Sequence, residues 1–65
     1  ERWEGAFLGW QLLSAAEGET PDTLYGMALA ARHLGARAEA QEYLTRALAL
    51  APTHRKSKEL MELVR

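Results

Sequence analysis

Apolar residues recur at every third or fourth position along most of this chain, which is the spacing of one face of an α-helix. Four stretches with this rhythm predict helices over residues 2–17, 21–34, 37–51 and 54–64. The fourth stretch is the most polar, and we expect it to face water on most of its sides. The expected apolar faces comprise Trp3, Ala6, Phe7, Trp10, Leu13 and Ala16, widened by Leu8 and Leu12; Leu24, Met27, Ala28, Ala31 and Leu34; Ala36, Ala40, Tyr43, Leu44, Ala47, Leu48 and Ala51; and Leu60, Met61 and Val64.

Residues that begin or end helices stand between these stretches. Thr20 can cap the second helix, with Pro21 at its first position and Asp22 at the positive end of its dipole. Gly35 suits a left-handed position after a helix, and Pro52 cannot donate the amide hydrogen bond that would continue one. The connections are short, so we expect neighbouring helices to run antiparallel.

Composition supports a small, all-α domain. Among 65 residues there are 12 alanines and 11 leucines, but one valine and no isoleucine, so helix formers dominate. The absence of cysteine excludes disulfides and thiolate metal sites. The formal charge of −1 gives no overall attraction to nucleic acid, and no apolar run approaches the roughly 20 residues of a membrane span. No targeting segment is present in these residues, so we expect a cytoplasmic protein that contacts neither nucleic acid nor membrane.

The pattern repeats weakly when the chain is shifted by 34 residues, because apolar residues align with apolar residues, mostly of similar size, and a helix-breaking residue aligns with another. The aligned pairs are Ala6 with Ala40, Trp10 with Leu44, Leu13 with Ala47, and Gly18 with Pro52. Residues 21–54 resemble a tetratricopeptide repeat. The resemblance rests on Leu24, Met27, Ala28, Gly35, Ala40, Leu44, Ala47 and Pro52. Two positions depart from the pattern: Ala31 replaces the usual aromatic residue, whose volume Trp10 could restore, and Ala36 replaces the usual capping aspartate.

The resemblance implies antiparallel helical hairpins in a right-handed superhelix. Residues 1–17 would be the second helix of a preceding repeat, 21–51 a full repeat and 54–64 a capping helix. We therefore expect the chain to be the C-terminal end of a longer array, or to pair with itself. The surface expected for self-association is the aromatic face of the first helix, which would lack a covering helix: Trp3, Phe7 and Trp10.

Proteins of this family bind peptides or protein segments in a groove lined by the first helix of each repeat. Carried over by position, the groove residues here would be Asp22, Tyr25, Leu29, Arg32 and His33. The lysines and asparagines with which chaperone-binding members hold a C-terminal carboxylate are missing. Tyr25 and Leu29 instead favour an apolar contact, with Arg32 offering charged hydrogen bonds to an acidic or C-terminal group. The resemblance implies a scaffold with a protein or peptide partner and no catalytic function.

Other interpretations of the chain are weaker. No cofactor or metal is expected: His33 suits the end of its helix, His54 a solvated position, and Ser14 and Ser57 exposed helix surfaces. A DNA-binding helix-turn-helix is disfavoured for two reasons: the position of its second helix that should pack inward is the polar Gln41, and that helix carries charges of both signs. The chain could also be an accessory or oligomerisation domain of a larger enzyme. The one basic cluster is either a solvated face or a docking patch for an acidic segment: Arg55, Lys56 and Lys58.

Overall fold

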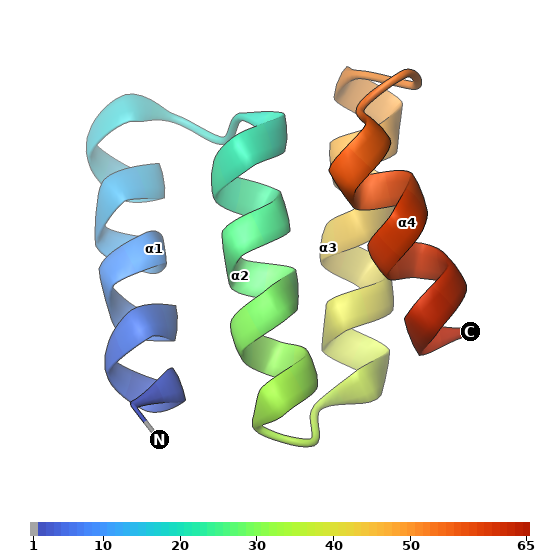
Figure 1. Cartoon of the computed structure of the whole chain (residues 1–65). Coiled ribbons are helices and arrows are strands. Elements are labelled where there is room, and N and C mark those ends of the chain that lie inside the picture. The colour runs from blue at the N-terminus through green and yellow to red at the C-terminus, as the bar shows by residue number, and fades with distance from the viewer. Residues whose placement is uncertain (1) are drawn as a thin grey trace.

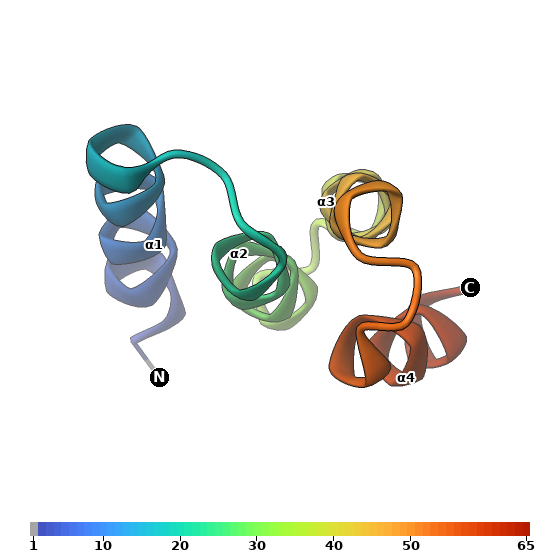
Figure 2. The ribbon, with the colours of Figure 1, turned by 90° about the horizontal axis from the view of Figure 1, so that it is seen from above.

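The computed structural model describes residues 2–65, which form four helices connected by short turns (Figure 1). They are α1 (Trp3–Glu17), α2 (Pro21–His33), α3 (Arg37–Leu50) and α4 (Arg55–Val64). Successive helices run antiparallel, and all predicted ends agree within one residue. Seen from above, α1 and α3 lie on one side of the molecule and α2 and α4 on the other (Figure 2). No helix in residues 2–65 is long and apolar enough to cross a membrane.

The start of α2 is held by a reciprocal pair of hydrogen bonds between two threonines. The Thr23 amide donates to Thr20 Oγ1 at 3.1 Å, and the Thr20 amide donates to Thr23 Oγ1 at 2.9 Å. Pro21 occupies the first turn, where a missing amide hydrogen costs nothing. The predicted cap is therefore confirmed, and Thr23 takes the part that a glutamate or glutamine usually plays in this motif.

Gly35 ends α2 with φ of +83°, a left-handed conformation that most residues with a side chain avoid. The Gly35 amide donates to Arg32 O at 3.1 Å, and the Ala36 amide donates to Ala31 O at 2.8 Å. These two bonds satisfy carbonyls at the helix end. The chain can therefore reverse within three residues and bring α3 back along α2.

The core lies mainly between α2 and α3 and is closed by α4. Small residues at the crossing let the two helices approach, while leucines fill the remaining space. The side chains that are completely buried here are Leu24, Ala28, Ala30, Ala40, Leu44 and Ala47. Leu60 and Val64 of α4 are also buried and join the cluster around Ala28 and Leu44. The predicted faces of the second, third and fourth helices are thus largely confirmed, except that Leu34 is 40% exposed.

Helix α1 packs on α2 with a narrower apolar face than predicted. Trp3, Phe7 and Trp10 are half-buried, whereas Leu8 and Leu12 are 55% and 63% exposed. The wider stripe was wrong because helical spacing places the two leucines on the opposite side of the helix from the aromatic residues. Among residues 2–65, α1 lies at the edge of the molecule with α2 as its neighbour, so nothing covers that side (Figure 2). Helix α1 consequently has no fully buried residue.

Candidate protein-binding face

The surface formed by α2 and α4 carries most of the predicted groove residues. Asp22, Tyr25, Leu29 and Arg32 are spaced by three or four positions and so share one side of α2. Helix α4 packs beside that side, since α2 and α4 are in contact and lie on the same side of the molecule (Figure 2). We call this surface the α2–α4 face; it consists of those four residues of α2 and of Lys56 and Leu63 of α4. Tyr25 and Leu29 are half-buried in it, and the other four are exposed.

One end of the α2–α4 face is held by a chain of hydrogen bonds. His54 Nε2 lies 3.0 Å from Asp22 Oδ1, and His54 Nδ1 lies 2.7 Å from Ser57 Oγ. The Ser57 amide also donates to His54 Nδ1 at 3.3 Å, so His54 caps α4. The Tyr25 ring meets the imidazole edge-on, with 6.2 Å between ring centroids. This network fixes the start of α4 against the start of α2.

The positions of His54 and Ser57 overturn two sequence predictions. The His54 side chain is only 18% exposed, and Ser57 is completely buried rather than on the helix surface. Both belong to the cap, because His54 precedes α4 and Ser57 is the third residue of that helix. The spacing of a polar residue and a second one three positions later is a known helix-start pattern and was the signal available in the sequence.

A Ser-His-Asp chain also occurs in hydrolases, where the serine attacks a substrate carbonyl. Here Ser57 Oγ has no exposed surface, so a substrate cannot approach it. The imidazole is occupied on both nitrogens, by Ser57 and by Asp22. The arrangement therefore serves to join two helices.

The other end of the α2–α4 face contains a pocket of about 310 Å³. Its lining residues come from the end of α2, the following turn, the start of α3 and the end of α4: Arg32, Gly35, Arg37, Leu63 and Val64. Neither Arg32 nor Arg37 forms an ion pair within 4.0 Å in the described residues 2–65. Sequence reasoning missed Arg37 and Leu63, because only the fold brings the start of α3 and the end of α4 to the end of α2.

His33 lies outside the α2–α4 face. Its imidazole stacks on the Trp3 indole with 4.0 Å between ring centroids and 4° between ring planes, so it faces α1. Phe7 meets Tyr43 at 6.0 Å, and Trp10 lies against Gly26. All three aromatic residues of α1 thus contact other helices of this chain. The large apolar side chains of α1 that are exposed are Leu8, Leu12 and Leu13.

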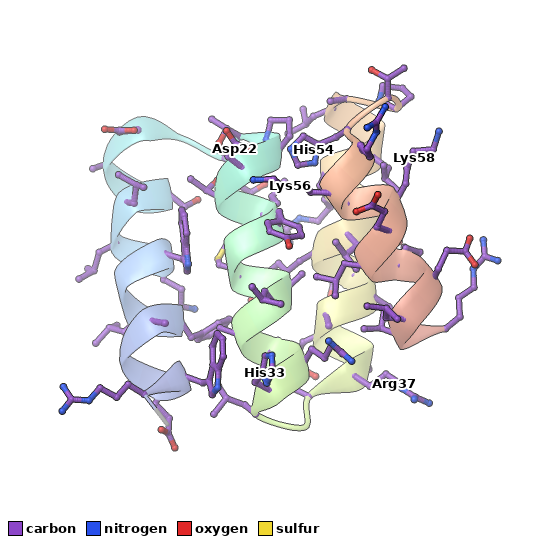
Figure 3. The ribbon with its side chains drawn as sticks, in the orientation of Figure 1. Asp22, His33, Arg37, His54, Lys56 and Lys58 are labelled. Carbon is purple, nitrogen blue, oxygen red and sulfur yellow. The ribbon has the colours of Figure 1, made fainter. Side chains whose placement is uncertain are left out.

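The basic residues of α4 do not form one patch. Lys56 lies beside Asp22 and His54 between α2 and α4, whereas Lys58 points away from α2 (Figure 3). Of the two lysines, only Lys56 can meet a ligand bound on the α2–α4 face. No three potential metal ligands gather among residues 2–65.

The family model for the tetratricopeptide repeat matches residues 21–54, just over half of the chain. The chain belongs to the tetratricopeptide-repeat family. The matched residues contain α2, α3 and the turn that leads to α4. No curated protein and no solved structure matches the chain significantly. Tetratricopeptide repeats generally mediate interactions between proteins.

The two departures from the tetratricopeptide pattern have structural consequences. Ala36 leaves the start of α3 without a side-chain cap. Ala31 is buried in the cluster against which Phe7 packs, whereas the Trp10 indole lies over Gly26, more than one helical turn earlier in α2. The aromatic residues packed against the cluster that contains Ala31 are Phe7, Tyr25 and Tyr43, whereas Trp10 packs against the separate cluster of Leu24, Met27 and Ala47, so the expectation that Trp10 would fill the volume at Ala31 was wrong.

Proposed function

We propose that this chain binds a segment of another protein on the α2–α4 face and acts as a scaffold without catalytic activity. The main support is that four predicted groove residues, Asp22, Tyr25, Leu29 and Arg32, share one side of α2 beside α4. Leu63 of α4 extends this surface and is 61% exposed. The burial of Ser57, described above, supports a role other than catalysis.

The composition of the face favours a mixed contact. Tyr25 and Leu29 are half-buried, so their positions are held by packing and little side-chain entropy is lost on binding. Leu63 supplies apolar surface, and the Arg32 guanidinium supplies hydrogen-bond donors without a partner of opposite charge within 4.0 Å in residues 2–65. Apolar residues surrounded by such polar groups are typical of surfaces that bind proteins.

The test compares two leucines with similar exposure on different faces. Leu63, on α4, is 61% exposed and Leu50, at the end of α3, is 57% exposed, so either can become glutamate without loss of the core. The immobilised chain and both variants are used to capture proteins from a lysate, and any captured protein is purified and measured directly. We expect Leu63→Glu to weaken binding at least tenfold and Leu50→Glu to leave it unchanged. Equal retention by both variants contradicts the proposal.

Helix α1 offers a second contact surface, on a different side from the aromatic face predicted for self-association. Trp3, Phe7 and Trp10 face α2, so we propose that any self-association uses the opposite side of α1, where Leu8 and Leu12 are exposed. Sedimentation of the purified chain tests this. We expect Leu12→Glu to abolish any association, whereas a chain that stays monomeric at high concentration rules out self-association altogether.

A further inference from the structure

The pocket at the lower end of the α2–α4 face combines two arginines with two apolar residues. Arg32 and Arg37 line it from α2 and α3, and Leu63 and Val64 line it from α4. Its volume of about 310 Å³ is at the lower limit for small-molecule sites and is large enough to admit a side chain of a bound segment. Such a lining matches a carboxylate attached to a short apolar stem.

Neither arginine is paired with a carboxylate within residues 2–65. Arg46 pairs with Glu19, and Glu62 pairs with Arg65 at 3.5 Å, but no carboxylate of residues 2–65 lies within 4.0 Å of Arg32 or Arg37. Arg32 has a structural explanation, because a cation in the last turn of α2 interacts favourably with the helix dipole. Arg37 has none, because it stands in the first turn of α3, where the dipole disfavours a positive charge. An anion bound between them would offset that cost.

We propose, on the basis of the function proposed above, that this pocket binds an aspartate or glutamate side chain of an acidic segment in the partner protein. A second cation, Lys56, lies at the opposite end of the same face, whereas Arg37 lies at the lower end (Figure 3). A chain has only one C-terminal carboxylate, which can meet only one of these two ends. Acidic side chains can meet both.

The length of the face sets the spacing of the two acidic residues. Asp22 and Arg32 are ten positions apart on α2, which corresponds to about 15 Å along the helix. An extended peptide covers that distance in about four to five residues. The preferred segment therefore has two acidic residues about four positions apart, with an apolar residue between them that contacts Leu29 and Leu63.

The probe is a short acetylated and amidated peptide in which two glutamates flank an alanine-leucine-alanine core. Its affinity is measured by NMR titration of the labelled chain at low and high salt. We expect peaks of Arg32, Arg37 and Leu63 to shift and the affinity to fall with salt. Arg37→Gln and Arg32→Gln should each weaken binding about tenfold, as expected for hydrogen bonds between charged groups. Arg2→Gln, an exposed arginine at the start of α1, is the matched control and should change nothing.

A second peptide with glutamines in place of the glutamates distinguishes this inference from the proposed function. If both peptides bind equally and only Leu63→Glu weakens them, the face binds protein segments but the carboxylate site is absent. If a peptide with a free C-terminus binds better, and replacing its glutamates by glutamines does not change its affinity, the group held in the pocket is a chain terminus and our assignment is overturned. If no peptide shifts any residue of the face at millimolar concentration, the acidic-segment assignment is overturned, whereas the proposed function stands or falls with the comparison of Leu63→Glu and Leu50→Glu.

Discussion

Gly26 offers the sharpest test of how α1 is held, because the indole of Trp10 lies directly over it. Gly26 is buried in α2, and a Cβ built there would come within 3.0 Å of three atoms of that indole. Carbon atoms pack best at about 3.5–4.0 Å, so Gly26→Ala forces the ring, or α1 as a whole, to retreat by about 1 Å. The substitution therefore places a helix-stabilising residue where packing forbids it.

The two effects of Gly26→Ala have opposite signs. Alanine is favoured over glycine inside a helix by about 1 kcal/mol, whereas overpacking a fitted interface costs about 1–3 kcal/mol. We expect a net loss of about 1–2 kcal/mol from a total stability of roughly 3–10 kcal/mol for a chain of this length. Gly9→Ala, on the open side of α1 where a Cβ meets nothing within 4 Å, should instead stabilise the chain by about 0.5–1 kcal/mol.

Urea and thermal unfolding followed by circular dichroism measure both variants. A change of 1 kcal/mol moves the melting temperature by about 4–8 °C in a domain of this size, so the opposite signs are easily resolved. In a Trp10→Leu background the obstacle is gone, and Gly26→Ala should then stabilise the chain as Gly9→Ala does. If Gly26→Ala stabilises the unaltered chain as much as Gly9→Ala, the indole does not pack on Gly26 and the account of the α1–α2 interface is refuted.

Two further predictions concern α2 and α3. Thr20→Ala removes the hydroxyl that accepts the Thr23 amide and should cost about 1 kcal/mol, seen as a melting temperature lower by several degrees; Thr53→Ala, in the exposed turn before α4, is the control and should change little. Leu44→Ala empties a completely buried site and should cost about 2–5 kcal/mol in urea unfolding, leaving the chain partly unfolded at 37 °C, whereas a loss below 1 kcal/mol would mean that the core is not packed around this residue.

The helices and most of their ends could be predicted because they depend on residues close together in the sequence. The threonine pair that starts α2 spans three positions, and the bonds that end it connect residues no more than five apart. Gly35 takes a positive φ because it has no side chain, which is a property of that residue alone. The tetratricopeptide resemblance was visible for the same reason: its alanines and leucines mark one face of each of two adjacent helices.

The candidate binding face was predictable only in part. The α2 positions Asp22, Tyr25, Leu29 and Arg32 lie together because helical spacing puts them on one side. His33 is adjacent to Arg32 in sequence, yet the 100° turn between neighbours points it toward Trp3 instead. The packing of α1 on α2 decides whether the His33 side chain meets solvent or another helix. The sequence pattern of α2 alone carries no information about that packing.

The sequence by itself determined that this chain forms four antiparallel helices of a tetratricopeptide type, because helix formation and termination are local. Only the tertiary structure decided which side of α1 is covered and that Ser57 is buried beneath His54. It also decided that Arg32, Arg37 and Leu63 share a pocket. These features join residues from different helices, and their proximity follows from how the helices pack rather than from any spacing along the chain.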